Sequence, residues 1–153
     1  MHGFSSRARR RISKATMNVL KDKHGDYGKL RQSMVDRQIV HRGVRAPLVL
    51  DAMRSVPREA FLPPDLREFA YDDSPLPIEE GQTISQPYIV ALMAEALLLQ
   101  GGETVLEIGT GSGYAAAVIA KIAQHVYTIE RYSQLAVKAA ATLAVEGFDN
   151  VHV

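Results

Sequence analysis

The chain has 153 residues, of which 46% are hydrophobic and 23% are charged, and it contains no cysteine. This composition is typical of one folded domain, and it excludes disulfides, thiolate metal sites and a cysteine nucleophile. No apolar run reaches the roughly 18 residues that a membrane-spanning helix requires.

The N-terminal part of the chain differs in charge from the rest. Up to Arg31 there are nine Lys or Arg and two Asp, a net charge of +7, while the whole chain carries +1, so the remainder carries −6. Residues 1–28 are predicted to be a basic, disordered extension. Their Arg-rich, Ser-containing start is also typical of a transit peptide or a nucleic-acid arm, but no aromatic residues lie between the arginines for base stacking.

Two helices are expected after this extension. Apolar residues along 30–42 approximate a helical stripe that Gly43 can end, and residues 46–55 form a second helix with Pro47 in its first turn. The stretch 56–81 is too rich in proline for central strands and is expected to consist of loops. Four apolar residues of this region are expected in the core: Met34, Val49, Met53 and Phe61.

A third helix is expected over residues 88–99, and the segment in front of it contains a serine at a special position. Ser85 stands where an N-cap residue belongs, and Pro87 follows in the first turn. As a structural role alone, Ser85 would cap this helix. Capping is compatible with a functional role, because a capped helix start holds the hydroxyl in place.

The next stretch has the order of a nucleotide-binding unit. In chain order we expect a short buried parallel strand over 104–108, a turn with Gly109, Gly111 and Gly113, a helix over 114–124, a strand over 125–129, the acidic Glu130 and a third strand over 150–153. Glycine allows tight turns and lets a ligand lie against bare backbone. An acidic residue about 20 residues after the glycines can accept the hydroxyls of a ribose. This pattern is typical of a doubly wound α/β sheet.

The glycine spacing argues against a dinucleotide. A G-x-G-x-x-G loop would place glycine or alanine at the position of Tyr114. The run from Glu107 through Gly109, Gly111 and Gly113 instead resembles the glycine loop of S-adenosylmethionine-dependent methyltransferases with a Rossmann-like fold. That resemblance implies S-adenosyl-L-methionine as cofactor, with Glu107 positioning its charged amino-acid end. A glycine-rich turn in an unrelated α/β protein is the alternative.

Several short runs together resemble one methyltransferase family. They are Val56-Pro-Arg-Glu59, Ala70-Tyr-Asp-Asp73, Pro75-Leu-Pro-Ile78, Gly81-Gln-Thr-Ile-Ser-Gln-Pro-Tyr88, Leu106-Glu-Ile-Gly-Thr-Gly-Ser-Gly-Tyr114 and Ile129-Glu-Arg131. Over roughly residues 33–153 this order is similar to that of the protein-L-isoaspartate O-methyltransferases, which repair damaged proteins. The resemblance implies the roles of six residues: Ser85 is the catalytic-site serine, Gln82, Thr83 and Ile84 help to enclose the cofactor, and Glu130 with Arg131 holds its ribose and adenine end.

The implied chemistry needs little acid or base catalysis. A carboxyl group with an ordinary pKa of about 4 is already ionised at neutral pH, so the nucleophile arrives activated. Alignment of oxygen, methyl carbon and sulfur can lower the barrier by on the order of 7–11 kcal/mol. A hydroxyl at Ser85 could orient the attacking oxygen of an isoaspartyl protein or peptide. In the family, the ester then closes to a succinimide, and hydrolysis returns part of the material as normal aspartate.

The chain departs from the family pattern after its third expected strand. In the family, a Gly-Asp-Gly turn that contacts adenine and further strands follow, whereas this sequence stops at Val153. We therefore expect only the N-terminal, about three-stranded part of the sheet, behind an N-terminal helical region, within residues 29–153. The strand 104–108 should have one unpaired edge, which favours self-association. The chain, alone and monomeric, is expected to be either poorly folded or inactive.

Three other functions compete with methyl transfer to a protein. A non-catalytic remnant could serve as a binding module. A nucleic-acid methyltransferase guided by the basic extension is disfavoured by the acidic remainder. A nicotinamide-dependent dehydrogenase is disfavoured by Tyr114 and by the lack of a recognisable Lys/Tyr or His/Asp grouping.

The five histidines show no metal-ligand spacing, so no metal site is predicted. The lack of cysteine fits a reducing, cytoplasmic location.

Overall fold

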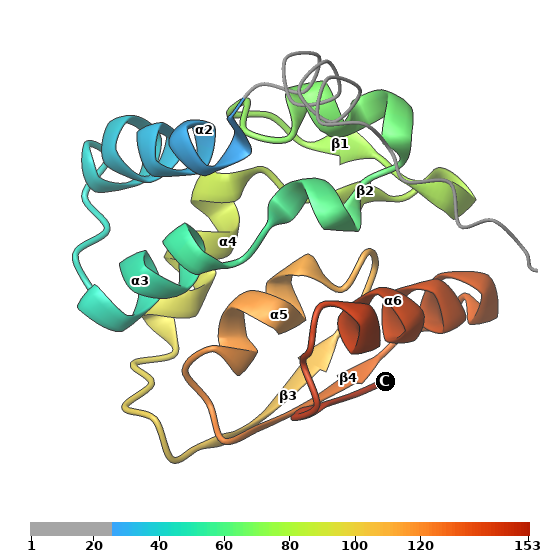
Figure 1. Ribbon diagram of the computed structural model, residues 1–153. Helices are drawn as coiled ribbons and strands as arrows, with labels where there is room; N and C mark the ends of the chain where they lie inside the picture. Colours follow the sequence, from blue (N-terminus) through green and yellow to red (C-terminus); the bar gives the residue numbers. More distant parts are fainter. Residues whose placement is uncertain (1–25) are drawn as a thin grey trace, which may run out of the picture.

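The structure is a computed structural model that describes residues 26–153 (Figure 1). The predicted basic extension lies outside these residues up to position 25. Its last three residues belong to the described part, where the Asp26 carboxylate accepts a hydrogen bond from the Lys29 amide at 3.2 Å and caps the first described helix.

The first described helix changes its winding halfway. Helix α2 (Tyr27–Met34) continues directly into the π-helical segment η1 (Val35–Val40) and a turn that includes Gly43, whose φ is 102°. The sequence pattern predicts one regular helix over 30–42 instead. The spacing of apolar residues explains the difference, because Met34 and Ile39 are both buried and lie five residues apart. A π-helix closes i→i+5 hydrogen bonds and brings such a pair to one face.

The proline-rich part is compact although it contains little regular structure. Helix α3 (Pro47–Ser55) forms as predicted and is followed by the 3-10 segments η2 (Arg58–Phe61) and η3 (Pro64–Phe69). Strands β1 (Leu76–Pro77) and β2 (Thr83–Ile84) then pair antiparallel around the 3-10 turn η4 (Glu79–Gly81). The absence of long strands in this stretch agrees with its proline content.

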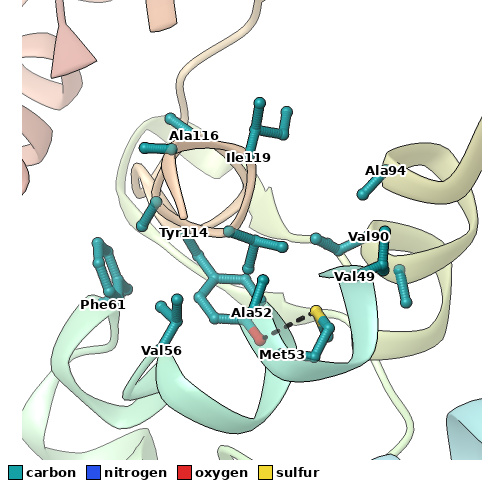
Figure 2. Packing of buried hydrophobic residues seen from close by; sticks show 14 of the residues in the cluster. Val49, Ala52, Met53, Val56, Phe61, Val90, Ala94, Tyr114, Ala116 and Ile119 are labelled. Atoms are coloured by element: carbon teal, nitrogen blue, oxygen red, sulfur yellow. Dashed lines mark hydrogen bonds between the residues drawn. The ribbon is translucent and has the colours of Figure 1, made fainter. Parts of the chain in front are cut away.

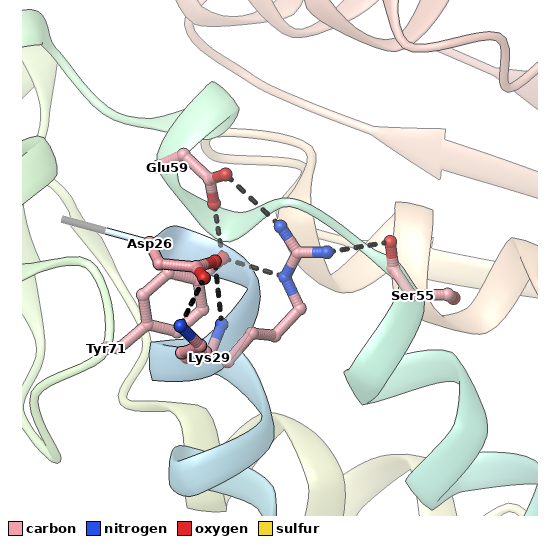
Figure 3. A network of polar contacts seen from close by, with 6 residues as sticks. Asp26, Lys29, Ser55, Glu59 and Tyr71 are labelled. Atoms are coloured by element: carbon pink, nitrogen blue, oxygen red, sulfur yellow. Dashed lines mark hydrogen bonds and ion pairs between the residues drawn. The ribbon is translucent and has the colours of Figure 1, made fainter. Parts of the chain in front are cut away.

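A polar network ties α2 to this proline-rich part (Figure 3). The Arg31 guanidinium donates from Nε to the Tyr71 hydroxyl at 2.8 Å and from Nη2 to Glu59 Oε1 at 3.1 Å. The Tyr71 hydroxyl in turn donates to the Glu59 carboxylate. Burial and the hydrogen bond to Glu59 raise the pKa of Tyr71, so its hydroxyl keeps the proton that it donates.

The second half of the chain forms the predicted three-stranded parallel sheet. Helix α4 (Pro87–Ala96) leads into β3 (Thr104–Ile108), followed by α5 (Tyr114–Ala120), β4 (His125–Ile129), α6 (Ser133–Val145) and β5 (Val151–His152). The strand order is β3-β4-β5, and both neighbouring pairs are parallel. Helices α5 and α6 lie on the same side of the sheet (Figure 1). This confirms the expected α/β architecture.

Two helices end earlier than predicted. Helix α4 stops at Ala96 rather than at residue 99, and Leu98 in the following turn has a positive φ of 53°. Helix α5 stops at Ala120 rather than at residue 124. The limits of such helices are set by the turns that follow them, which apolar periodicity does not describe.

The strand β3 is parallel as predicted, but it is not buried. Within the described residues it pairs only with β4, so its other edge is open, as expected. Alternate side chains of β3 and β4 point away from the helices, and they remain exposed by 62% at Leu106, 74% at Ile108, 48% at Tyr127 and 55% at Ile129. The prediction of a buried strand is wrong, because the apolar character of a strand does not supply a layer that covers it.

The hydrophobic core is centred on α3, α4 and α5 (Figure 2) and includes Val126 of β4. Tyr114 at the start of α5 is fully enclosed: its ring meets the edge of Phe61 at 5.8 Å between centroids, and its hydroxyl lies 3.8 Å from the Met53 sulfur. The guanidinium of the buried Arg58 lies over the same ring at 4.9 Å. The four residues predicted in the core are all buried: Met34, Val49, Met53 and Phe61.

Candidate active site

The glycine loop connects β3 to α5, and its three glycines serve different purposes. Gly109, Gly111 and Gly113 all have positive φ, at 98°, 53° and 89°. A Cβ on Gly113 would lie 3.2 Å from the Leu143 side chain, so this glycine allows α5 and α6 to approach each other. A Cβ on Gly109 would meet nothing within 4 Å. Bare backbone therefore faces open space at Gly109, as a bound ligand requires.

Glu130 holds the glycine loop from the end of β4. Its Oε2 accepts a hydrogen bond from the Gly111 amide at 2.9 Å, and its Oε1 accepts one from the Tyr132 amide at 3.0 Å. The hydrogen bond from Tyr132 is the main reason that the pKa of Glu130 is lowered, and Gly111 acts in the same direction. Glu130 is therefore an ionised acceptor, and its oxygens have further lone pairs for ligand hydroxyls.

Glu107 is a half-buried carboxyl group under the helices. The Thr128 hydroxyl donates to Glu107 Oε2 at 2.5 Å, and the hydroxyl oxygens of Thr128 and Thr110 lie 2.7 Å apart. Burial raises the pKa of Glu107, while the hydrogen bond from Thr128 lowers it and the charge of Glu130 raises it further. A cationic group beside Glu107 would relieve the cost of its charge.

The two buried threonines of this cluster were missed by sequence reasoning. Thr110 lies between Gly109 and Gly111 of the glycine loop, and Thr128 stands on the inner face of β4. The sequence features that indicate this cluster are a threonine next to a loop glycine and a threonine at an inward-facing strand position.

Ser85 faces the glycine loop across a cavity of about 60 Å³. One side of this cavity is formed by residues 83–85 and Val90, and the other by residues 109–112 with Tyr114 and Ala115. Two segments more than twenty residues apart in the chain therefore form one site. Ser85 is exposed, and its hydroxyl makes no hydrogen bond to any of residues 26–153.

The prediction that Ser85 caps the following helix is wrong. The N-cap of α4 is Gln86, one residue later, and it makes no side-chain capping hydrogen bond. Pro87 is the first helical residue and lacks an amide hydrogen, so the helix has one donor fewer to satisfy. The Ser85 hydroxyl is thus left available to a ligand.

Not every predicted site residue lines this cavity. Thr83, Ile84, Ser85, Gly109 and Gly111 do. Glu107, Gly113 and Glu130 support the loop from behind or beside it, through the contacts given above.

Two further predicted residues have local partners. The Gln82 amide group donates to the Glu80 carbonyl at 3.1 Å. The Arg131 guanidinium lies 4.5 Å from the centre of the Tyr132 ring and donates to its hydroxyl.

Two properties of the described residues bear on other functions. No cluster of three His, Cys, Asp or Glu side chains that could hold a metal ion occurs within residues 26–153. In the same part of the chain, the helices are too short or too polar to cross a membrane.

Comparisons with known proteins agree with the site. Residues 29–153 match the family described as protein-L-isoaspartate(D-aspartate) O-methyltransferase (PCMT). Protein-L-isoaspartate O-methyltransferase 1 of Rhodopseudomonas palustris (strain HaA2) is 70% identical over 123 residues, which are 80% of this chain and 50% of that relative. The Synechococcus sp. (strain JA-2-3B'a(2-13)) protein-L-isoaspartate O-methyltransferase is 55% identical over 132 residues, 86% of this chain and 54% of the relative.

Solved structures give the same result. A protein-L-isoaspartate O-methyltransferase superposes with a TM-score of 0.67 at 31% identity, covering 82% of this chain and 40% of that one. A putative enzyme of the same name from Plasmodium falciparum, in complex with S-adenosyl-L-homocysteine, has a TM-score of 0.68 at 25% identity, covering 80% and 61%. The chain spans about half the length of the curated relatives it matches. The match to the family model over residues 29–153 and the identity to these relatives show that the chain belongs to the protein-L-isoaspartate O-methyltransferase family.

Proposed function

We propose that this chain contains the cofactor-binding and serine-bearing part of an enzyme that methylates the free carboxylate of L-isoaspartyl residues in damaged proteins. The observation that carries the proposal is the shared cavity between residues 83–85 and the glycine loop. One wall offers bare backbone, and the other offers an exposed hydroxyl at Ser85. A methyl donor and an acceptor can therefore meet between them.

The cofactor that we propose is S-adenosyl-L-methionine. The bound S-adenosyl-L-homocysteine in the Plasmodium falciparum protein supports it, as do the open space at Gly109 and the ionised carboxylate of Glu130. Glu130 would accept the ribose hydroxyls, with Arg131 next to it at the adenine end, and Gln82 to Ile84 would enclose the cofactor. Glu107 would hold its ammonium group. When bound, the cofactor supplies the methyl group from its sulfonium.

The residues of the chain would act by positioning. The substrate carboxylate is ionised at neutral pH and needs no general base. Ser85 would donate a hydrogen bond to one carboxylate oxygen and so aim the other toward the methyl carbon. Because the carboxylate would take the methyl group from a sulfonium that leaves as a neutral thioether, these residues would have no proton to hold or move. Orientation of this kind can replace acid and base catalysis.

Cofactor binding gives the first test. In isothermal titration calorimetry, S-adenosyl-L-homocysteine should bind the chain, and Glu130→Gln should weaken binding by about tenfold because a charged acceptor becomes neutral. Glu146→Gln, an exposed carboxylate at the end of α6, is the matched control. Absence of binding by the wild type would favour the alternative, a non-catalytic remnant that serves as an interaction module.

Methyl transfer gives the second test. With labelled S-adenosyl-L-methionine and an isoaspartyl peptide, Ser85→Ala should lower kcat by about 10- to 100-fold, because the attacking oxygen loses its orientation. Ser133→Ala, at an exposed serine of α6, should leave kcat unchanged. Equal turnover by the Ser85 variant and the wild type would remove Ser85 from the active site.

Three further features of this chain are part of the proposal. The methyltransferase portion comprises residues 29–153, preceded by a basic extension, and its location is cytoplasmic, which the lack of cysteine supports.

Two copies associate through the open edge of β3, whose unpaired backbone groups and exposed Ile108 favour contact. Sedimentation velocity at rising concentration should detect this association, and Ile108→Lys should reduce it. A concentration-independent monomer would contradict it.

A further inference from the structure

The first turn of α4, which directly follows Ser85, lacks the usual means of holding a helix start. Its N-cap residue Gln86 makes no side-chain capping bond, and Pro87 contributes no amide hydrogen. On the other side, Ser85 follows β2, whose last residue Ile84 pairs with Leu76 of β1. Ser85 and the N-cap Gln86 are therefore the two residues that link a paired strand to α4, and other contacts must fix the helix start.

Two side chains from distant parts of the chain, Arg42 and Asp73, fix this helix start. Asp73 Oδ1 accepts a hydrogen bond from Gln86 Nε2 at 2.9 Å, and Asp73 Oδ2 accepts one from Arg42 Nη1 at 2.7 Å. The Arg42 guanidinium also lies 3.5 Å from the centre of the Tyr88 ring. Gln86 and Tyr88 flank Pro87, so both sides of the first turn of α4 are held.

The residue types suit this arrangement. Arginine has a planar guanidinium that can donate to a carboxylate at its edge while its face stacks on an aromatic ring, and lysine cannot do both. Asp73 uses a separate oxygen for each donor, so the two bonds do not compete. We call Arg42, Asp73, Gln86 and Tyr88 the α4 clamp.

We propose that Arg42 and Asp73, acting through the α4 clamp, are positioning residues for Ser85. Neither lines the cavity, so they act by holding Gln86 and Tyr88 and thereby the direction of the Ser85 hydroxyl relative to the glycine loop. This inference rests on the proposed function for its catalytic consequence. Its structural part is independent of that function.

Hydrogen exchange tests the structural part. The amides of Ile89 and Val90 both donate to the Gln86 carbonyl, at 3.1 and 3.3 Å, and report on the first turn of α4. Measured by mass spectrometry, exchange over residues 84–90 should be faster by about threefold in Asp73→Ala and in Arg42→Lys, the change expected when a half-exposed ion pair is lost. Arg54→Lys, which alters a partly exposed ion pair on α3, is the matched control and should leave this segment unchanged. Unchanged exchange in Asp73→Ala and Arg42→Lys would overturn the proposal.

Kinetics tests the positioning part. Asp73→Ala and Arg42→Lys should lower kcat for methylation of an isoaspartyl peptide by about tenfold, because the hydroxyl is misdirected, with the KM for S-adenosyl-L-methionine unchanged. Tyr88→Phe retains the ring that Arg42 stacks on and should retain both the exchange rate and kcat. Faster exchange with unchanged kcat would reduce the clamp to a structural contact and overturn its positioning role.

The two proposals fail in different ways. If the wild type transfers no methyl group, the proposed function fails, and with it the catalytic consequence of the clamp. The exchange measurement still supports or refutes the hold on α4 in that case.

Discussion

The two faces of the three-stranded sheet reverse the usual distribution of polar and apolar residues. Beneath α5 and α6, the covered face carries Val126 but also Glu107 and Thr128, which are hydrogen-bonded to each other. The opposite face is apolar and exposed, with Leu106, Ile108, Tyr127 and Ile129. Near the end of the strands, the polar groups are inside and the apolar groups are outside.

This reversal shows that the alternation of residues along a strand does not by itself determine which residues are buried. Alternation assigns each residue to one of two faces, but whether a face is covered depends on which helices pack on it. Polar groups are stable on the covered face here because Thr110, Thr128 and Glu107 hydrogen-bond with one another. An exposed apolar face of this kind is typical of an interaction surface.

The largest expected effect contrasts equivalent substitutions on the two faces. Val126→Ser should lower the free energy of unfolding by about 3 kcal/mol, because it leaves a cavity and buries a hydroxyl. Ile108→Ser, on the exposed face, should change it by no more than about 0.5 kcal/mol. Urea denaturation of both variants measures the difference. Similar losses at both positions would show that the exposed face is covered in solution.

A smaller effect is expected within the glycine loop at the edge of the covered face. Gly113→Ala should cost about 2 kcal/mol, because it combines a left-handed backbone with a Cβ crowded against Leu143. Gly109→Ala should cost about 1 kcal/mol, from the backbone alone, but should weaken binding of S-adenosyl-L-homocysteine. Denaturation and calorimetry on the same pair separate the two roles. A Gly109 variant with full affinity would argue against a ligand at that backbone.

The pH dependence of stability should separate Glu107, whose pKa is raised, from Glu130, whose pKa is lowered. Burial raises the pKa of Glu107 in the folded chain, so the free energy of unfolding should fall as the pH rises from the unfolded pKa, about 4.3, through the folded pKa. Glu107→Gln should remove that fall. Backbone hydrogen bonds from Tyr132 and Gly111 lower the pKa of Glu130, so its contribution is present above the unfolded pKa and is lost as the pH falls through the folded pKa.

Urea denaturation between about pH 3 and pH 8 tests both signs. For Glu130→Gln, the loss of stability relative to the wild type should be seen near neutral pH and should disappear in acid. A Glu107→Gln variant with the pH profile of the wild type would show that burial of that carboxyl group has no energetic effect.

Local patterns predicted the parts of the fold that depend on neighbouring residues. The strand, glycine turn, helix, strand and acidic residue from Thr104 to Glu130 follow from periodicity and turn chemistry, and the structure confirms them. The winding of η1 could not be predicted in this way, because the buried Val35 and Ile39 also have the four-residue spacing of an ordinary α-helix. The N-cap of α4 was misplaced by one residue, because serine and glutamine can both precede a helix that begins with proline.

The sequence by itself determined that this chain has a nucleotide-type glycine loop, which residues could hold a cofactor, and which family it resembles. Only the tertiary structure decided that Ser85 faces Gly109 across one cavity, that Asp73 and Arg42 hold the helix beside it, and that half of the sheet surface is exposed. Turn geometry and periodicity depend on residues close in the chain. Contacts between distant segments depend on how α3, α4 and α5 pack around Tyr114, which no local pattern contains.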